Sequence, residues 1–351
     1  MQHSIRECFR GGGYVFATKA LDIARDAGIT DPARLASNEN PFPPSEMAIS
    51  AAREALLSVN RYPDEKTASL TEALRDYHGN YHFVTGVGMD GVIEATIRTL
   101  VEPGDHVAIS TPTFSFYGLA IQAQGGTAIQ IPRNPDFSVD VEKFIEESRG
   151  ARVSFLCSPN NPTGNATSLE DVRLILDGID GVLFLDCAYV EFSGIDYRPL
   201  MKEYDNLIIG RTMSKVFSLA GLRVGYAFVP EWFLGAYCRA ATPFTLSAVS
   251  SAGAVGALSD RKHQDDFIAH VSAWRERFMS EVKFPVFESA ANFMLIDVAP
   301  HTGDEVVEAL ARKGVIVRSC TSFPGLGNHY IRVCVGLDHE CERFIEGINS
   351  L

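Results

Sequence analysis

Short runs of apolar residues, separated by loops and helical stretches, recur along the first two thirds of the chain. Several runs are continuous rather than alternating, as expected for strands that are covered on both faces by helices. The repeat of strand, loop and helix therefore predicts an α/β fold with a mostly parallel central sheet. The predicted strands are residues 107–110, 127–131, 152–157, 182–185, 207–209 and 226–229.

The pattern changes after about residue 245. A long helical stretch, 249–281, precedes a smaller set of predicted strands at 292–298, 315–318 and 330–335, with a helix at 303–313. A chain of 351 residues is long enough for one large and one smaller domain. We therefore predict a large domain of residues 41–244 and a smaller α+β domain built from residues 1–40 and 245–351.

Charge and cysteine content exclude several classes of protein. The net charge of −13 argues against binding to nucleic acid or to an anionic membrane surface. Seven cysteines without a CxxC pair indicate reduced thiols, hence a cytoplasmic protein. No apolar run approaches the roughly 20 residues of a membrane span, and the first residues lack a signal-peptide pattern. The histidines show no zinc-like spacing, so we expect no metal site.

One loop, residues 211–225, carries residue types suited to covalent chemistry beside an anion. A lysine in a loop of this kind can form a Schiff base with a carbonyl group when its surroundings lower its pKa. Arginine and hydroxyl groups bind phosphate. Together they suggest pyridoxal 5′-phosphate (PLP), although an ordinary surface loop is the alternative that these residues alone leave open. The residues concerned are Lys215, Thr212, Ser214 and Arg223.

A glycine-rich turn, Gly86-Val87-Gly88-Met89-Asp90-Gly91, opens a predicted helix. It has the GxGxxG spacing of a dinucleotide site, but that reading needs an acid at the end of the next strand. The next strand ends Ile109-Ser110-Thr111-Pro112, without one. We therefore expect the backbone N–H groups of Gly88, Met89 and Asp90 to form an anion site, where one phosphate would fit as well as a pyrophosphate. A glycine-rich turn without a ligand is the alternative.

Three further strand ends carry groups that suit the edges of the same cofactor. Phe114 can stack on a planar ring, and Asn161 can donate to a ring oxygen. Asp186 ends a buried strand, where a carboxylate needs a partner such as a protonated pyridine nitrogen. Tyr189 follows three residues later and can also reach the ring oxygen. Each residue has an ordinary structural explanation, but agreement of all of them by chance is improbable.

These motifs resemble those of the fold-type-I PLP enzymes, and within them the histidinol-phosphate aminotransferase-like group. They occur in family order from about residue 36 to 340. The matching segments are 38–41, 61–64, 112–114, 159–164, 186–189, 214–215, 221–226 and 291–293, together with Arg318 and Arg332.

The resemblance implies a PLP-dependent aminotransferase that moves an amino group between an amino acid or amino-alcohol phosphate and a 2-oxo acid. It implies that Lys215 forms the internal aldimine and shuttles the proton, that Asp186 pairs with the pyridine nitrogen, and that Phe114 stacks on the ring. Tyr189 and Asn161 would contact the phenolic oxygen. The implied phosphate ligands are Thr212, Ser214, Arg223 and the backbone of Gly88, Met89 and Asp90.

The resemblance also implies a homodimer, in which Tyr62 reaches the phosphate of the partner subunit. It places four residues at the substrate: Asn38, Asn161, Arg318 and Arg332. Arg332 would bind the substrate carboxylate, and Arg318 is the candidate for a second anionic group such as a phosphate.

Departures from the family pattern leave alternatives. Cys187 and Gly91 stand where acids are usual, and 243–247 reads Pro-Phe-Thr-Leu-Ser instead of Pro-Tyr-Asn-Val-Ser. Residues 318–333 are similar to the threonine-phosphate decarboxylases, whose His-Gly-Gly is matched only in part by Arg10-Gly11-Gly12. A decarboxylase of threonine phosphate is therefore the alternative, and a non-catalytic PLP-fold binding protein a more remote one. Tyr189 favours transamination.

Overall fold

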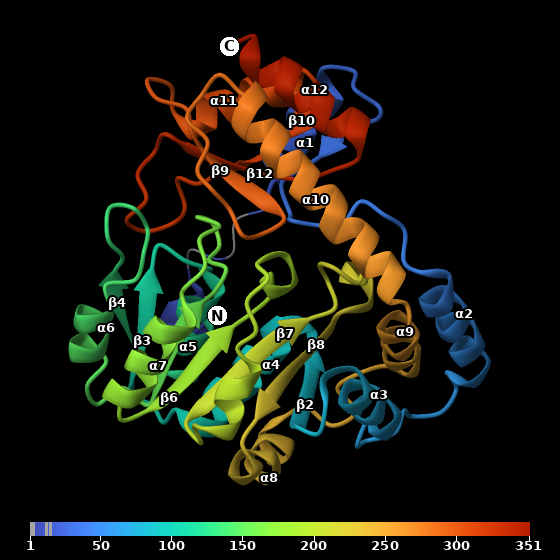
Figure 1. Cartoon of the computed structure of the whole chain (residues 1–351), viewed down its shortest axis with the longest axis vertical. Helices are drawn as coiled ribbons and strands as arrows, with labels where there is room; N and C mark the ends of the chain where they lie inside the picture. The colour runs from blue at the N-terminus through green and yellow to red at the C-terminus, as the bar shows by residue number, and fades with distance from the viewer. Residues whose placement is uncertain (1–3, 11–12, 14–15) are drawn as a thin grey trace.

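A seven-stranded mixed sheet forms the centre of the larger part of the computed structural model, which describes residues 4–10, 13 and 16–351 (Figure 1). The strand order is β2-β8-β7-β6-β5-β3-β4. Six strands run in the same direction, and β8 runs in the opposite direction to all of them. The predicted α/β class is confirmed. The strands are β2 (His82–Val87), β3 (His106–Thr111), β4 (Thr127–Pro132), β5 (Val153–Cys157), β6 (Val182–Asp186), β7 (Leu207–Thr212) and β8 (Val224–Val229).

Helices pack on both faces of this sheet, which explains the continuous apolar runs. In β6, Leu183 and Leu185 belong to the core on one face, and Phe184 belongs to the core on the other. The second face is covered by α4 (Gly88–Leu100), α5 (Phe116–Gln124) and α8 (Glu231–Ala240). The remaining helices of this part are α2 (Glu46–Ala55), α3 (Ala68–His78), α6 (Val141–Glu147), α7 (Leu169–Gly178) and α9 (Ala248–Ser259).

The smaller part contains a three-stranded antiparallel sheet in the order β11-β12-β9 and a parallel pair, β1-β10. Its strands are β1 (Ala33–Arg34), β9 (Phe293–Asp297), β10 (Val315–Ile316), β11 (Arg318–Ser319) and β12 (Tyr330–Cys334). The single strand predicted over 315–318 is therefore wrong, because the chain bends there and its halves join different sheets. Its helices are α1 (Thr18–Asp26), α11 (Gly303–Arg312) and α12 (Asp338–Asn349).

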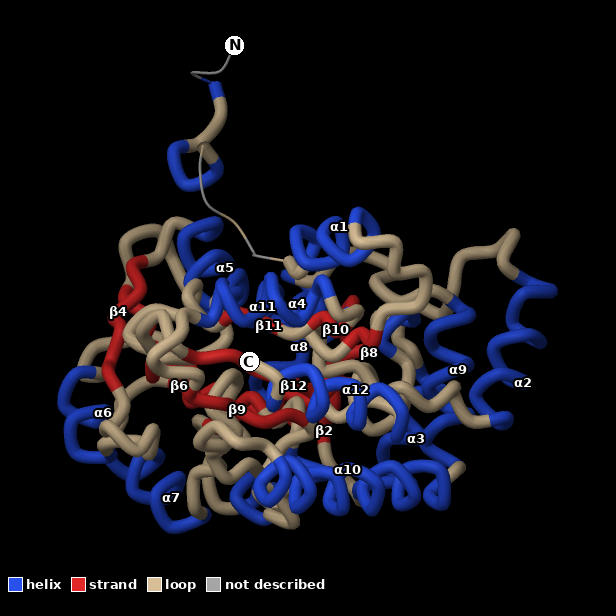
Figure 2. The backbone as a smooth tube through the Cα atoms, turned by 90° about the horizontal axis from the view of Figure 1, so that it is seen from above, coloured by secondary structure: helices blue, strands red, loops and turns tan. Residues whose placement is uncertain are grey.

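The long helix predicted over 249–281 is two helices, α9 and α10 (Arg261–Glu281). The break falls at Asp260, whose side chain accepts a hydrogen bond from the backbone of His263 and so caps α10. Helix α10 extends from the larger part into the smaller one (Figure 1). At the other end of the chain, residues 4–10 lie outside the layers on the side of α5 (Figure 2), where Arg6 Nη1 donates to Ala123 O at 2.6 Å.

Two features are absent from the described residues: a membrane-spanning helix and a cluster of metal-binding side chains. None of their helices combines the length and apolar character needed to cross a membrane. Within the same ranges, no cluster of three or more His, Cys, Asp or Glu side chains could hold a metal ion.

Candidate active site

A cavity of about 370 Å³ opens at the carboxyl ends of the central strands. Cys157, Asp186 and Thr212, the last residues of the adjacent strands β5, β6 and β7, all line it. Parallel strands bring their carboxyl ends to one edge, which is the usual place for a ligand in such sheets. Predicted residues that line the cavity are Asn38, Met89, Asp90, Phe114, Asn161, Asp186, Tyr189, Thr212, Ser214, Lys215, Arg223 and Arg332.

The amine of Lys215 lies in this cavity with a depressed pKa. Its Nζ donates to Ser37 O at 3.2 Å and lies 5.6 Å from the centroid of the Tyr189 ring. Burial, followed by the positive charge of Arg332, lowers the pKa of Lys215 to about 8. About half of the amine is therefore unprotonated near pH 8, far more than for an ordinary lysine, and a nucleophilic lysine must be unprotonated.

The carboxyl group of Asp186 is buried at the end of β6, and no ion pair joins it to a cation of the described residues. Its Oδ2 accepts a hydrogen bond from Tyr117 OH at 2.6 Å, and its Oδ1 accepts one from the backbone N of Ala188 at 3.0 Å. Burial raises the pKa of Asp186 to about 6, in spite of these two donors. A buried carboxyl group of this kind fits a cationic ligand atom, such as a protonated pyridine nitrogen.

Tyr117 was missed by the sequence analysis. It is fully buried at the start of α5 and stacks on Phe155, with ring centroids 4.8 Å apart. Its position three residues after Phe114 was the available signal, because one helical turn brings it back beneath the same strand end. Nothing in the sequence, however, shows that its hydroxyl reaches Asp186.

We expect Tyr117→Phe to lower kcat about tenfold or more, since a hydrogen bond to a charged group contributes roughly 1.5–3 kcal/mol. The pKa of Asp186 should also rise further, because the lost donor favours the carboxylate. The pH profile of kcat and the dissociation constant of PLP measure both effects. Tyr237→Phe is the matched control: it removes another buried hydroxyl, which donates to Thr85 O at 3.0 Å. Equal losses in the two variants would contradict this role.

The opposite end of the cavity is suited to an anion. Helix α4 begins there at Gly88, whose N–H donates to Arg223 O at 2.8 Å, and the next two residues, Met89 and Asp90, line the cavity. Gly88 has a φ of +69°, and a Cβ on it would lie 2.6 Å from Arg223 Nη2. Arg223 Nη2 donates to Asp90 Oδ2 at 2.9 Å, and the Thr212 hydroxyl donates to Ser214 Oγ at 3.0 Å. One cation, two hydroxyls and a helix N-terminus therefore lie together, and groups of these kinds suit an anion.

Polar groups from distant segments meet on the remaining wall. Asn38 Nδ2 donates to Tyr189 OH at 3.0 Å. Arg332 donates to Asn161 Oδ1 and to Ala36 O, both at 2.5 Å. The Nε of Arg332 is buried and has no partner among the described residues. This cation has backbone and amide oxygens as partners but no carboxylate, which suits a carboxylate supplied by a substrate.

Three predicted residues do not line the cavity. Gly88 is not among the lining residues, although its neighbours Met89 and Asp90 are. Tyr62 is 82% exposed, with its ring stacked on that of Phe244 at a centroid distance of 4.6 Å. Arg318 is the register partner of Arg332, donates to Ser322 Oγ at 3.0 Å and lines a separate cavity of about 380 Å³. Wall residues that were not predicted are Ser37, Glu39, Cys157, Ala188, Ala220 and Gly221.

Comparison with known proteins defines the class. A family profile described as "Aminotransferase class I and II" matches residues 30–348. The chain belongs to this family, and it is a PLP-dependent aminotransferase. The cavity supplies a lysine, a buried carboxyl group and an anion cradle, all of which fit PLP.

Three individual proteins similar to this chain share one name, histidinol-phosphate aminotransferase. The chain is 62% identical to a histidinol-phosphate aminotransferase of Methanoculleus marisnigri and 57% identical to one of Methanocorpusculum labreanum, in each case over 100% of both chains. A crystal structure of histidinol-phosphate aminotransferase from Sinorhizobium meliloti, in complex with pyridoxal-5′-phosphate, aligns with a TM-score of 0.87. That match covers 99% of this chain and 97% of the other at 23% identity, so it supports the fold.

Proposed function

We propose that the protein transfers an amino group between histidinol phosphate and a 2-oxo acid. One observation carries the proposal: relatives with that activity in their names are 57–62% identical to this chain over its whole length. None of these three relatives is named a decarboxylase. The Arg10-Gly11-Gly12 match to the decarboxylases includes Gly11 and Gly12, which lie outside the described residues.

The proposed roles follow the positions of the side chains. PLP, when bound, supplies an electron-withdrawing ring that stabilises negative charge on the substrate carbon. Lys215 binds the cofactor covalently and moves the proton at the substrate Cα. Asp186 holds the charge of the ring nitrogen, and Phe114 stacks on the ring. Tyr189 and Asn161 bind the phenolic oxygen.

The remaining residues would bind the phosphate of the cofactor and the carboxylate of the substrate. The proposed phosphate ligands of the cofactor are Thr212, Ser214, Arg223 and the backbone at Met89 and Asp90. The expected contribution of Gly88 is not kept, because its N–H donates to Arg223 O. Asn38 orients Tyr189 through the hydrogen bond described above and borders the substrate. Arg332 binds the carboxylate of the amino acid and 2-oxo acid.

The proposal is tested by incubating the purified holoenzyme with L-histidinol phosphate and 2-oxoglutarate. We expect formation of glutamate and spectral conversion of the cofactor to its amino form in the first half-reaction. O-phospho-L-threonine is assayed separately, because it is the substrate of the alternative decarboxylase. Release of carbon dioxide from it, without glutamate formation from histidinol phosphate, would contradict the proposal and favour the decarboxylase.

We further propose that Arg318 reads the substrate phosphate, since it lies opposite Arg332 on the paired strands β11 and β12. Arg318→Ala should raise the KM for histidinol phosphate by about 10–100-fold, because a charge-assisted contact is lost. The KM for an unphosphorylated amino donor should change little. Steady-state kinetics with both donors measure the difference. Arg332→Ala is the comparison, because it should raise the KM for a carboxylate-bearing amino donor more than the KM for histidinol phosphate, which has no carboxylate. Equal losses in Arg318→Ala would refute the phosphate role.

We also propose a homodimer in which Tyr62 reaches the partner's cofactor. The support is an exposed apolar patch of Leu56, Leu57, Val59 and Tyr62, whose exposed fractions are 55%, 79%, 56% and 82%. Isolated exposed apolar side chains are common, but a contiguous group marks an interface.

If the patch is the interface, Leu57→Glu should dissociate the dimer and lower cofactor affinity, even though Leu57 does not line the cavity. Tyr62→Ala should weaken PLP binding about tenfold, as expected for one lost contact to a phosphate, while the dimer persists. Sedimentation velocity and PLP titration measure the two effects. A monomeric Leu57→Glu protein with unchanged PLP affinity and kcat would contradict a shared site.

We also propose the domain boundaries and the cellular compartment of the protein. We propose that residues 41–244 form the PLP-binding domain and that residues 1–40 and 245–351 form the small domain, with α9 and α10 as its connection. The seven cysteines are all free thiols. Free thiols support a location in the reducing cytoplasm.

A further inference from the structure

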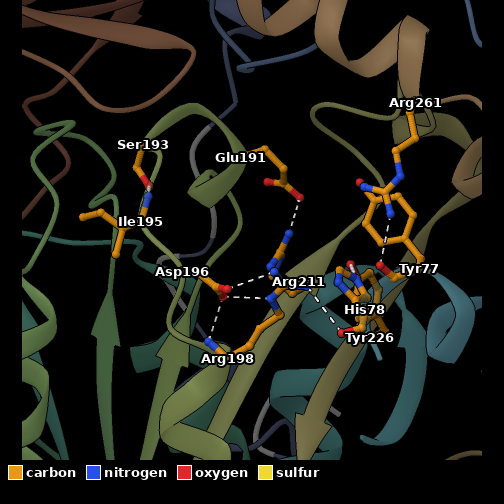
Figure 3. Close-up of polar contacts among 10 residues, drawn as sticks. All are labelled: Tyr77, His78, Glu191, Ser193, Ile195, Asp196, Arg198, Arg211, Tyr226 and Arg261. Carbon is orange, nitrogen blue, oxygen red and sulfur yellow. Dashed lines mark hydrogen bonds and ion pairs between the residues drawn. The ribbon is translucent and has the colours of Figure 1, made fainter. Parts of the chain in front are cut away.

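A buried ion pair, drawn in Figure 3, joins Glu191 to Arg211. Glu191 follows the turn that carries Tyr189, and Arg211 lies in the strand that leads into the loop of Lys215. Arg211 in β7 donates through Nη2 to Oε1 of Glu191 at 2.7 Å. Glu191 is the middle residue of the short helix η4 (Val190–Phe192). The two side chains are only 10% and 9% exposed, so little solvent screens their attraction.

Fold stability does not by itself account for such a pair. Moving both charges out of water is costly, and replacing a buried ion pair by apolar side chains of similar volume is often neutral or stabilising. Removing one partner, in contrast, leaves an uncompensated buried charge. A buried pair therefore contributes mainly a defined geometry, and the question is which geometry it defines.

The pair lies at the point where two catalytic segments leave the sheet. Strands β6 and β7 are parallel neighbours with Asp186 opposite Gly210, and Cys187 N donates to Gly210 O at 2.9 Å. Beyond that bond the two segments continue separately as the turn of Tyr189 and the loop of Lys215. Glu191 is two residues after Tyr189, and Arg211 is four residues before Lys215. The pair therefore connects the two segments beyond their last backbone contact.

The backbone of Arg211 is held by pairing with the neighbouring strand β8. Tyr226 on β8 is its register partner, and Tyr226 OH lies 2.8 Å from Nε2 of His78. Burial, with the charge of Arg211, lowers the pKa of His78 to about 2, so this ring is neutral and does not compete for Glu191. The nearby acid Asp196 has a cation of its own, Arg198, at 2.8 and 2.9 Å (Figure 3).

Helix α10 contacts the last residue of η4, Phe192. Phe192 packs edge-on against Phe267, with ring centroids 5.6 Å apart, and Arg275 Nη1 donates to Phe192 O at 3.3 Å. With η4 held by α10, and Arg211 by the sheet, the ion pair leaves little freedom to the turn between Asp186 and Glu191.

We propose that Arg211 and Glu191 are positioning residues for transamination: their ion pair holds the hydroxyl of Tyr189 at a fixed place relative to the amine of Lys215. The inference rests on the proposed roles of Lys215 and Tyr189. Neither Arg211 nor Glu191 lines the cavity, so any effect on the reaction must pass through the segments that they join.

Holoenzyme variants Arg211→Met, Glu191→Gln and Arg211→Met/Glu191→Leu test the proposal. The single variants should melt at lower temperature, and the double variant, with no unpaired charge, should regain most of the loss. Its kcat per bound PLP should nevertheless stay about 10–100-fold low, as expected for a small misplacement of reacting groups. The KM for the 2-oxo acid should change less, and the pH midpoint of the bound cofactor's absorption should move by about half a unit or more.

Recovery of kcat together with the melting temperature would overturn the inference, since the pair would then serve stability alone. If the double variant does not fold, Glu191→Gln decides, because it keeps shape and an acceptor oxygen: an unchanged kcat and spectral midpoint would overturn the inference. Asp196→Asn is the matched control. It breaks the neighbouring ion pair, which joins no catalytic segments, and should leave kcat unchanged; a loss equal to that of Glu191→Gln would also overturn the proposal.

Lys215→Ala separates a failure of the proposed function from a failure of the role of the ion pair. If Lys215→Ala keeps the covalent cofactor band, the proposed function is wrong and this inference is wrong with it. If Lys215→Ala loses that band while the pair variants retain full kcat, only this inference is wrong.

Discussion

Replacing Lys215 by alanine is expected to lower kcat by at least about 10³-fold, because in the proposed mechanism the same amine serves as nucleophile and as proton carrier. The lysine lies in the cavity, with its Nζ near Ser37 and the Tyr189 ring, and its pKa is lowered to about 8. No other lysine lines that cavity among the described residues, so no neighbour can substitute.

Absorbance and borohydride reduction followed by mass analysis measure the covalent link directly. Wild-type protein should retain PLP after reduction and denaturation, and Lys215→Ala should release it, even if PLP still binds non-covalently. Lys262→Ala is the control, since that lysine is exposed and paired with Asp266 at 2.6 Å. An unchanged reducible link in Lys215→Ala would remove the basis of the proposed mechanism.

Asp186→Asn is expected to act in opposite directions on the cofactor-free and the cofactor-bound protein. Burial raises the pKa of this carboxyl group from 3.8 to about 6, so the folded cofactor-free protein holds a proton that the unfolded chain has already released. This contribution to stability is fully present below about pH 4 and is lost as the pH rises through 6. By pH 8 the ionised, unpaired carboxylate costs about 3 kcal/mol.

Cofactor-free Asp186→Asn should therefore unfold at higher urea concentration than cofactor-free wild type at pH 8, with the difference disappearing near pH 4. With PLP bound, the order should reverse, and kcat should fall about 100-fold or more, because a preorganised charge is missing. Asp177→Asn provides the control: that carboxylate also accepts a tyrosine hydroxyl, Tyr204 OH at 2.9 Å, but it is exposed. A pH-independent difference between wild type and Asp186→Asn would contradict the assigned pKa.

The strand ends could be predicted because each one is a local pattern. A buried apolar run followed by Asp186, or by the turn that contains Asn161, is visible without knowledge of the rest of the chain. Parallel pairing then brings these ends to one edge, which is a property of the fold class. This is why most of the predicted residues line one cavity.

Contacts that depend on packing could not be predicted in the same way. The hydroxyl of Tyr117 meets Asp186 across 69 positions of sequence, and Arg211 meets Glu191 across 20. No periodic pattern encodes either contact. The position of Arg318 outside the cavity depends on the bend between β10 and β11, two strands of two residues each, which are too short to give a separate signal.

The pairing of β1 with β10 has a consequence for how the protein is made. Leu35 N donates to Ile316 O, and Cys334 N donates to Leu35 O, so the segment before the active-site asparagine is held by residues near the end of the chain. The same segment supplies Ser37 and Asn38, the partners of Lys215 and Tyr189. During synthesis from the amino terminus, the large sheet can form as a unit while this early segment waits for its partners. We therefore expect the wall of the cavity that contains Ser37 and Asn38 to form only after almost the whole polypeptide has left the ribosome.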